Sequence, residues 1–479
     1  MTRRNREHFR ITKLKRTHNR QNDTFTYNIS YETTPKTQTQ RTREIAEAFG
    51  LGTDQSKRFT LYDNATFTIH PTDIVLITGD SGSGKSILLN AIRKDLGAEA
   101  IDTRELATNP NTPIIETVGR NTTEAIQQLS KVGLNDAFLF LRTYTELSDG
   151  QKHRYQIAQL AQSGKKWWFL DEFTSILDRD TAKIVAWNLQ RTARQQHATA
   201  ICATTHNDIT EDLAPNLLIT KHYGKQLTIT HNPHANAKEC TLNRETHITQ
   251  GTTADYKTLS QFHYRTTRLP PPRKTFTLKR NEETIGAIVY GYPPPTCFGR
   301  RQAWKGTLQQ LQNEITTITR IVIHPKYRST GLGIKLIRET LPQAGTPNVE
   351  TIAVMAKYNP FFEKAGMQKI TETKPNPNLT EALNWIESLG FDHALMTNPD
   401  YCHKIVAYAG SENIKNMLTE LSRKGAVTRK TLIPLQGAFP KHKEFTQKLA
   451  QLDEDDLAQV LKRLSFLAQT KVYLFWTRK

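Results

Sequence analysis

The chain has 479 residues, with 65 Lys and Arg against 46 Asp and Glu, so its formal net charge is +19. Hydrophobic residues at 37% and charged residues at 23% are typical of about two to four folded domains, which excludes a wholly disordered protein. No apolar run approaches the ~20 residues of a spanning helix, so we expect no membrane association. Four separated cysteines without a CxxC pair favour a reducing, cytoplasmic location.

The first part of the chain begins with a basic segment. Residues 1–20 carry eight basic side chains and one acidic side chain, and we interpret them as a flexible arm. Alternating apolar residues predict a strand over 25–31, and a helix is expected over 43–49. Two further strands are expected over 59–69 and 74–78. Helices and strands then alternate, which predicts an α/β domain over residues 21–232.

A glycine-rich loop follows the strand at 74–78. Residues 79–86 (GDSGSGKS) match GxxxxGK[ST] and open an apolar helix over 87–92. In this pattern backbone N–H groups and the positive helix N-terminus hold phosphates. Lys85 would reach the β- and γ-phosphates, and Ser86 would bind Mg²⁺. The candidate ATP-binding residues of the loop are Gly79, Ser81, Gly82, Gly84, Lys85 and Ser86.

Further motifs accompany this loop. Residues 167–172 (WWFLDE) predict an apolar strand that ends in two carboxylates. Asp171 suits the Mg²⁺ shell, and Glu172 suits a base that polarises the attacking water. Residues 147–151 read LSDGQ. With these motifs in this order, the chain resembles the ABC-type ATPases, whose signature is LSGGQ.

This resemblance implies roles for other residues. Residues 175–178 resemble the D-loop, and His206 resembles the switch histidine. The signature residues Ser148, Gly150 and Gln151 would complete the ATP site of a second copy, which implies a head-to-tail homodimer. The chain departs from the family pattern at Asp149, which replaces a signature glycine, and no glutamine stands out as the Q-loop. Phe59 and Tyr62 are both candidates for stacking on adenine.

A second α/β block is expected over residues 254–370, after a linker at 233–253. A strand at 318–324 leads through a loop to a helix at 334–340. The loop contains Arg-x-x-Gly-x-Gly, which presents backbone N–H groups to a pyrophosphate. A Rossmann interpretation fails because the third glycine and the acidic partner are missing. The candidate residues of this loop are Arg328, Gly331 and Gly333.

The segments that flank this loop carry a second family resemblance. Together with residues 361–367 (FFEKAGM), the strand and loop resemble the GNAT acyltransferases. The resemblance implies that the loop binds the pyrophosphate of acetyl-CoA or another acyl-CoA, supported by Lys326 and Lys335. Phe362 stands where that family often has a general-acid tyrosine, so the acid would be Tyr358 or water. Glu314 is a candidate base.

Upstream residues carry a shorter resemblance. His263 and Tyr264, with residues 286–291, are similar to the Mom-type branch of the GNAT fold, which modifies DNA bases. The resemblance implies a catalytic role for both residues, and the alternative for His263 is an ordinary buried histidine. Residues 25–370 as a whole resemble a family described as an ABC-type ATPase fused to a predicted acetyltransferase.

The expected fold class is therefore α/β, with a P-loop ABC-type ATPase domain followed by a GNAT-fold α/β acyltransferase domain. Residues 371–479 are expected to form a mainly helical C-terminal extension that closes on a strand at 472–476.

The distribution of charge suggests the partner. Residues 241–370 carry 19 basic and 8 acidic side chains, whereas residues 21–240 carry 23 and 25. Such a cluster is typical of a surface that binds nucleic acid. The leading hypothesis is an ATP-hydrolysing acyltransferase that modifies a base in DNA or RNA. The alternatives are a protein N-acetyltransferase and a non-catalytic ABC clamp with a CoA-sensing domain. The expected phosphate contacts are Arg265, Arg268, Arg273, Lys274, Lys279, Arg280, Arg300 and Arg301.

Overall fold

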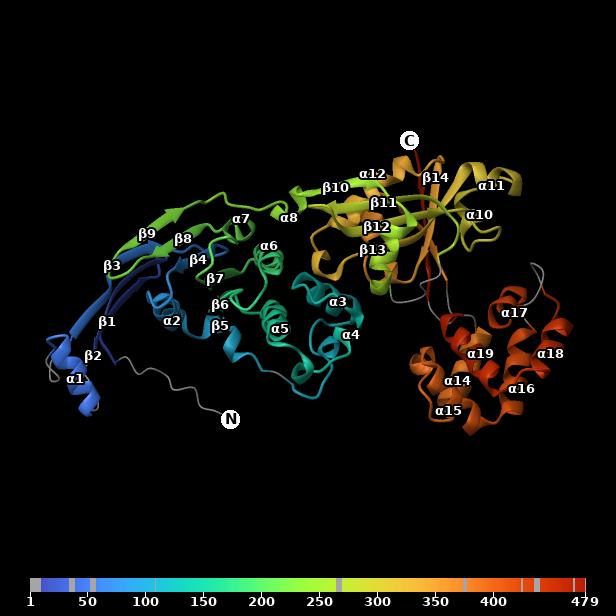
Figure 1. Cartoon of the computed structure of the whole chain (residues 1–479), viewed down its shortest axis with the longest axis horizontal. Coiled ribbons are helices and arrows are strands. Elements are labelled where there is room, and N and C mark those ends of the chain that lie inside the picture. Colours follow the sequence, from blue (N-terminus) through green and yellow to red (C-terminus); the bar gives the residue numbers. More distant parts are fainter. Residues whose placement is uncertain are drawn as a thin grey trace. The chain divides into compact units, whose positions relative to one another are not determined.

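The computed structural model describes residues 10–33, 39–51, 57–107, 109–263, 269–373, 377–423, 425–434, 440–467 and 470–478 (Figure 1). Contacts divide the chain into two compact units. One comprises Met1–Val289 and Arg320–Thr340, and the other comprises Tyr290–Thr319 and Leu341–Lys479. Within the described ranges, no helix is long and apolar enough to cross a membrane.

The first sheet is antiparallel, with the strand order β1-β2-β3. It consists of β1 (Arg10–Asn19), β2 (Thr24–Thr33) and β3 (Lys57–Thr68), and α1 (Gln40–Ala48) lies between β2 and β3 in the chain. The alternation in β2 buries Phe25, Tyr27 and Ile29 on one face, as predicted. Residues 10–19, expected to be part of a flexible arm, instead form β1, which pairs with β2. Residues 1–9 lie outside the described residues.

The second sheet carries the predicted ATP motifs. Its strand order is β5-β6-β7-β4-β8-β9; the ladders that join β5 to β8 are parallel and only β9 is antiparallel. Ile74–Gly79 is apolar and almost wholly buried, as a parallel strand covered on both faces must be. The strands are β4 (Ile74–Gly79), β5 (Ala100–Asp102), β6 (Trp167–Leu170), β7 (Thr199–Ala203), β8 (Leu217–Lys221) and β9 (Leu227–His231).

Helices connect these parallel strands, because parallel neighbours need a crossover. Two of them begin with side-chain caps: Ser148 accepts from the backbone N–H of Gln151, and Asp178 accepts from that of Thr181. The carboxyl ends of β4, β6 and β7 therefore meet at one edge, where α/β sheets bind ligands. The helices are α2 (Lys85–Leu96), α3 (Thr122–Lys131), α4 (Ala137–Phe140), α5 (Asp149–Gln162), α6 (Arg179–Gln195) and α7 (Thr210–Leu213).

The third sheet has the order β10-β11-β12-β13-β14-β16-β15. Residues 246–250, within the expected linker, form its edge strand, which pairs antiparallel with β11. The strands are β10 (Thr246–Gln250), β11 (Pro272–Arg280), β12 (Glu283–Gly291), β13 (Ile315–Ile323), β14 (Asn348–Ala353), β15 (Gln368–Glu372) and β16 (Val472–Thr477). The helices are α8 (Thr241–Arg244), α9 (Thr253–Leu259), α10 (Arg300–Ala303), α11 (Leu308–Glu314), α12 (Leu332–Thr340) and α13 (Phe361–Lys364).

The C-terminal region returns to this sheet. Strand β16 pairs antiparallel with both β14 and β15, so the helices before it form an insertion between β15 and β16, not the expected extension beyond the sheet. Val472, Tyr473 and Leu474 are completely buried. The inserted helices share a core of their own. They are α14 (Pro377–Ser388), α15 (Pro399–Ala409), α16 (Ser411–Ser422), α17 (Ala426–Leu432), α18 (His442–Ala450) and α19 (Glu454–Leu467).

Candidate functional sites

The glycine-rich loop joins β4 to α2. Gly79, Gly82 and Gly84 have φ values of 133°, 75° and 103°, which strain any residue with a side chain. A Cβ on Gly79 would lie 1.9 Å from the carbonyl oxygen of Lys221. The buried Lys85 donates from Nζ to the carbonyl oxygens of Gly79 (2.7 Å) and Asp80 (2.6 Å). The loop therefore forms a cradle, and backbone oxygens of the loop hold the ammonium group of Lys85.

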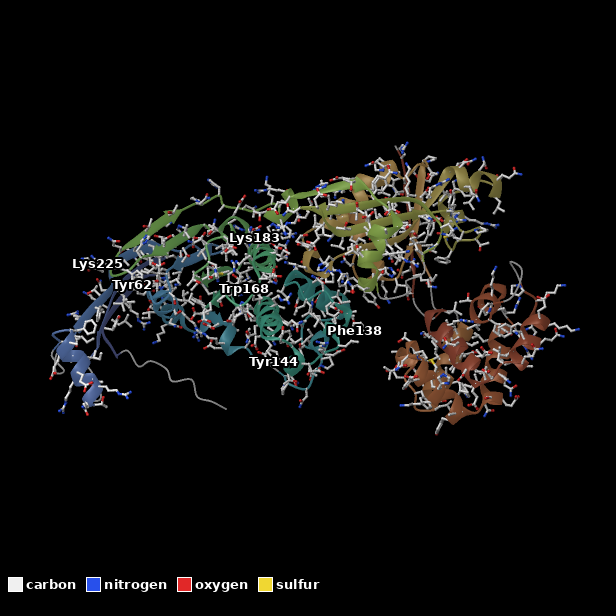
Figure 2. All side chains as sticks on the ribbon, in the orientation of Figure 1. Tyr62, Phe138, Tyr144, Trp168, Lys183 and Lys225 are labelled. Atoms are coloured by element: carbon white, nitrogen blue, oxygen red, sulfur yellow. The ribbon has the colours of Figure 1, made fainter. Side chains whose placement is uncertain are left out.

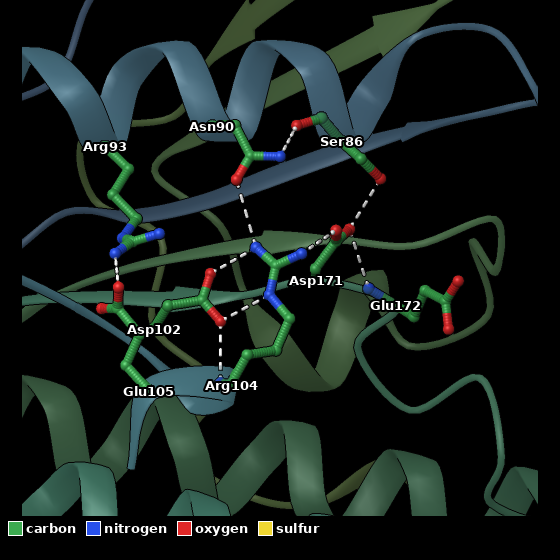
Figure 3. Close-up of polar contacts among 8 residues, drawn as sticks. All are labelled: Ser86, Asn90, Arg93, Asp102, Arg104, Glu105, Asp171 and Glu172. Carbon is green, nitrogen blue, oxygen red and sulfur yellow. Dashed lines mark hydrogen bonds and ion pairs between the residues drawn. The ribbon is translucent and has the colours of Figure 1, made fainter. Parts of the chain in front are cut away.

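The carboxylates after β6 lie beside this loop. Ser86 Oγ donates to Asp171 Oδ1 over 2.8 Å, and the backbone N–H of Glu172 donates to the same oxygen over 3.1 Å (Figure 3). Glu172 is exposed and has a φ of 50°. A hydroxyl and a carboxylate are the hard oxygen ligands that suit Mg²⁺. The donor set of Ser86 and Asp171 therefore fits the expected metal.

His206, the candidate switch histidine, follows the neighbouring strand. Strands β6 and β7 pair in parallel, so Glu172 and His206 follow adjacent carboxyl ends. The backbone N–H of Phe173 donates to the carbonyl of Ala203 (2.8 Å), which ties the two loops together. His206 is half-buried, and its backbone N–H donates to Thr204 Oγ1 over 3.2 Å.

The two candidate adenine-stacking aromatics differ in exposure. Tyr62, on β3 (Figure 2), is 1% exposed, and its hydroxyl donates to the carbonyl of Gly84 over 3.1 Å. Burial raises the pKa of this hydroxyl. Tyr62 therefore supports the glycine-rich loop and has no free face for a base. Phe59 is 36% exposed and stacks on Tyr31, with ring centroids 5.3 Å apart.

The signature segment lies at the start of α5. Ser148 is exposed and forms a capping box with Gln151. A Cβ on Gly150 would lie 3.3 Å from a methyl carbon of Leu177, so a larger residue would press on the D-loop segment. The carboxylate of Asp149 is almost fully exposed, 3.9 Å from the ammonium of Lys152. These exposed groups can contact a second molecule.

Arg104, which the sequence did not single out, reaches the carboxylate edge. It lies in the short 3₁₀ helix η2 (Thr103–Glu105) after β5. Its Nη1 donates to Asp171 Oδ2 over 3.2 Å, while Nε and Nη2 donate to the buried Asp102 (Figure 3). The hydrogen bond to Asp102 raises the pKa of Arg104. No short-range pattern signals such a contact, because 67 positions separate Arg104 from Asp171.

In the acetyltransferase domain, the candidate CoA loop joins β13 to α12. Gly331 has a φ of 93° and Ser329 a φ of 70°. Arg328 donates to the carbonyl oxygens of Ile323 (2.9 Å), Asn135 (2.8 Å) and Phe262 (3.3 Å). Its guanidinium thus braces the loop. The backbone N–H groups in the first turn of α12 have no acceptor within the helix, so they are candidates for contact with a pyrophosphate.

The basic residues beside this loop contact carboxylates of the ATPase. Lys326 Nζ lies 2.9 Å from Asp178 Oδ1 and 2.9 Å from Asp180 Oδ2. Arg280 Nη1 lies 2.9 Å from Asp180 Oδ2, and its Nε lies 2.7 Å from Glu245 Oε2. We call Asp178, Asp180, Arg280 and Lys326 the Asp178–Lys326 cluster. Residues 320–340 belong to the same compact unit as the ATPase.

Electrostatics within this cluster favour the charged forms. Burial opposes ionisation, but the hydrogen bonds from Lys326 and Arg280 lower the pKa of Asp180. Burial likewise acts against Lys326, yet Asp180 and Asp178 raise its pKa. Lys335, the other expected CoA support, donates to Thr246 Oγ1 (3.2 Å) and to the carbonyl of Thr246 (3.3 Å).

The candidate catalytic residues of the transferase have varied surroundings. Glu314 is the last residue of α11, and its Oε2 accepts from Trp304 Nε1 over 2.8 Å. Tyr358 is half-buried, with Lys357 Nζ 5.5 Å from its ring centroid. Phe362 is buried and packs on Phe361. His263 is half-buried at the end of a 3₁₀ turn. Tyr264, Arg265 and Arg268 lie outside the described residues.

One expected phosphate contact is instead an internal ion pair. Arg300 is buried and donates from Nε and Nη2 to the completely buried Glu350, over 2.9 and 2.6 Å. Tyr473 and Thr317 donate to the same carboxylate, each over 2.9 Å. Arg300 therefore cannot reach a nucleic acid from this position. The charge pattern of the sequence did not indicate this pair, because 50 positions separate Arg300 from Glu350.

The fold and the loops define two classes of site in one chain, a P-loop ATP site and a GNAT-type acyl-CoA site. Comparison with protein families agrees. Residues 62–175 match the family described as ABC transporter, and residues 240–367 match the family described as acetyltransferase (GNAT). The second match begins just before β10, within the expected linker.

Individual relatives match the ATPase part. The cytochrome c biogenesis ATP-binding export protein CcmA of Gluconobacter oxydans is 30% identical over 161 residues, which cover 30% of this chain and 73% of CcmA. The methionine import ATP-binding protein MetN of Corynebacterium glutamicum is 26% identical over 244 residues, which cover 42% of this chain and 66% of MetN.

A solved ATP-binding cassette of an ABC transporter in its ADP conformation is similar to 37% of this chain. The match covers 87% of that cassette, with 18% identity and a TM-score of 0.30. This chain belongs to the ABC transporter family through its ATPase domain, and it carries a GNAT acetyltransferase domain. ATP and acyl-CoA are the ligands of these two families.

Proposed function

We propose that the chain hydrolyses ATP and transfers an acyl group from acetyl-CoA or another acyl-CoA to a base in DNA or RNA, with ATP binding controlling substrate engagement. The observation that supports the link is the Asp178–Lys326 cluster. Asp178 belongs to the D-loop segment, and Lys326 lies two residues before Arg328 of the CoA loop. A movement of either loop must therefore rearrange ion pairs that hold the other.

The ATPase residues would act in one displacement. Lys85 would leave its backbone acceptors and bind the β- and γ-phosphates, and Ser86 and Asp171 would hold Mg²⁺, which neutralises phosphate charge when bound. Glu172 would accept a proton from water as the water oxygen bonds to the γ-phosphorus and the bond to the β-phosphate oxygen breaks. His206, on the adjacent loop, would donate to the γ-phosphate.

Two copies would form each complete ATP site. Ser148, Gly150 and Gln151 lie at the N-terminus of α5, where backbone N–H groups and the helix dipole attract an anion. They would contact the γ-phosphate held by a second copy in a head-to-tail homodimer. The exposed carboxylate of Asp149 would oppose that anion, so we expect closure to be weaker than in a site with glycine there.

The acceptor is assigned from charge and exposed aromatics. Tyr292 and Phe298 are exposed, and Arg301 and Lys305 nearby in the chain are exposed cations. Aromatic faces stack on bases and cations bind phosphates, so this segment suits single-stranded or flipped-out nucleic acid.

The four free cysteines fit a reducing compartment such as the cytoplasm.

The transfer step would use the thioester of acyl-CoA. An amino nitrogen of the base would attack the carbonyl carbon, the C–S bond would break, and the CoA thiolate would take a proton from Tyr358 or water. The proton lost by the nitrogen would pass to Glu314 or His263. Phe362 cannot donate a proton, so the general acid differs from the tyrosine expected at that position.

The test is nucleoside mass spectrometry of DNA and RNA from cells that express the wild type, Glu172→Gln or Gly333→Asp. A Cβ on Gly333 makes only an ordinary 3.7 Å contact with Ile323, so Gly333→Ala is the matched control. We expect an acylated nucleoside that disappears in the first two variants and remains in the control. Acylated peptides with unmodified nucleic acids would identify a protein N-acetyltransferase. Acyl-CoA binding without any acyl transfer would identify a CoA sensor.

A further inference from the structure

The guanidinium of Arg104 lies beside the proposed metal ligand Asp171 and is held in place by other hydrogen bonds. The buried Asp102 accepts from the backbone N–H of Arg104 (2.9 Å), from Nε (2.8 Å) and from Nη2 (2.6 Å). Nη2 also donates to Asn90 Oδ1 over 3.1 Å, and Asn90 in turn donates to the carbonyl of Ser86 over 2.7 Å (Figure 3). The guanidinium plane is therefore set by α2 and η2.

The remaining donor points at the proposed metal ligand. Nη1 donates to Asp171 Oδ2 over 3.2 Å, while Ser86 holds Oδ1 over 2.8 Å. Both carboxylate oxygens of Asp171 are thus engaged, one by a hydroxyl and one by a permanent cation. The side chain of Asp171 is 11% exposed and that of Arg104 is 51% exposed, so water screens this pair only in part.

We propose that Arg104 competes with Mg²⁺ for Asp171 and thereby sets the Mg²⁺ concentration at which the ATPase binds nucleotide. The proposal rests on the magnesium site of the proposed function. An arginine stays protonated, so it cannot yield to a metal by losing its proton. It can yield only by breaking the Nη1–Oδ2 hydrogen bond, and Asp102 and Asn90 keep the rest of the guanidinium in place.

The competition has a chemical consequence for the nucleotide. A Mg²⁺ ion held by Ser86 and Asp171 would lie close to the Arg104 guanidinium, and like charges repel strongly at such separations. A metal held by Asp171 would therefore weaken or displace the hydrogen bond from Nη1 to Oδ2. Nucleotide without metal would leave the Arg104–Asp171 pair intact. Arg104 is a positioning residue in this scheme, because it acts through Asp171.

The test is a Mg²⁺ titration of the binding of a fluorescent ADP analogue to the full-length protein, which requires no turnover. Arg104→Ala should lower the half-saturating Mg²⁺ concentration by about tenfold, the effect of losing one charged hydrogen bond to the ligand. Arg104→Lys keeps the charge but loses the two side-chain hydrogen bonds to Asp102. Its half-saturating Mg²⁺ concentration should lie between those of the wild type and Arg104→Ala. Arg93→Ala is the control, because Arg93 pairs with Glu105 nearby but does not contact Asp171.

Asp171→Asn separates the two proposals. If this variant leaves the Mg²⁺ requirement unchanged, the proposed metal site fails, and the inference fails with it. If Asp171→Asn raises the requirement but Arg104→Ala leaves it unchanged or raises it, the metal site stands and the inference is overturned. In the double variant the effect of Arg104 should disappear, because its partner is gone. Thermal melting in EDTA shows that each variant is folded.

Discussion

The ATP site and the CoA loop differ in what their charged side chains contact. In the ATP site, Lys85 is held by backbone oxygens and Asp171 by a hydroxyl and a guanidinium, so each charge is poised to exchange partners with a ligand. Beside the CoA loop, Lys326 and Arg280 are neutralised by carboxylates of the ATPase. The comparison shows that the number of basic residues in a segment overstates how many cations can bind a partner. Some of the basic residues in 241–370 form ion pairs within the chain.

The largest effect is expected at the ATP site. Glu172→Gln removes the proposed base for the attacking water, so ATP hydrolysis should fall by about 10²–10⁴-fold while nucleotide binding persists. Phosphate release and binding of a fluorescent ATP analogue measure the two. Glu116→Gln, a change at an exposed glutamate on the 3₁₀ turn Ile114–Glu116, is the control. Equal losses of hydrolysis and binding would contradict the assigned role.

The buried ion pair of the acetyltransferase domain provides the next test. Arg300→Met leaves Glu350 buried without its cation and should destabilise the fold by about 3–5 kcal/mol. Arg300→Met with Glu350→Leu should cost less, because no buried charge is left unpaired. Chemical denaturation followed by intrinsic fluorescence measures both. A small loss in the single variant would mean that Glu350 does not need the cation of Arg300 for stability.

The CoA loop should respond to added negative charge. Gly333→Asp places a carboxylate near the proposed pyrophosphate and should weaken acetyl-CoA binding by at least about tenfold, whereas Gly333→Ala should not. Isothermal titration calorimetry gives both affinities. Equal binding by the two variants would show that acetyl-CoA binds elsewhere, and the CoA loop would then not be a phosphate-binding loop like the one in the ATP site.

The smallest effect concerns coupling. Lys326→Ala should abolish any change in ATPase rate on adding acetyl-CoA, a change we expect to be about twofold to fivefold because the pair is partly exposed. Lys369→Ala, which breaks a comparably exposed pair with Glu372, is the control. An acetyl-CoA effect that survives Lys326→Ala would show that the cluster does not link the sites.

The pH dependence of this coupling follows from the pKa shifts. A carboxylate with a lowered pKa stabilises the folded contact above its ordinary value of 3.8, and this contribution is lost as the pH falls through the lowered pKa. A lysine with a raised pKa stabilises below 10.5, and its contribution is lost as the pH rises through the raised pKa. The coupling should therefore be constant across neutral pH, which ATPase assays with and without acetyl-CoA can measure.

Much of the ATP site could be predicted because its chemistry lies in short contiguous segments. The cradle needs glycines at 79, 82 and 84, and the strand ending in Asp171 and Glu172 is recognisable from its apolar run. The adenine-stacking aromatic was left open, because whether Tyr62 or Phe59 is exposed depends on what packs over each ring.

In the acetyltransferase domain the sequence predicted less. The strand at 472–476 was expected, but its insertion between β14 and β15 was not, since it pairs with residues a hundred or more positions away. The expected roles of Arg280 and Arg300 were based on charge, and their partners Asp180 and Glu350 come from distant segments.

By itself the sequence determined the class of the protein, an ABC ATPase joined to a GNAT domain. Each domain is recognisable from one loop, because a few neighbouring residues fix the backbone geometry of that loop. Only the tertiary structure decided which charges are available. Ion pairs form between side chains that the fold brings within about 4 Å, whatever their separation in the chain, so Arg104 at Asp171 and Lys326 at Asp178 were visible only once the sheets had assembled.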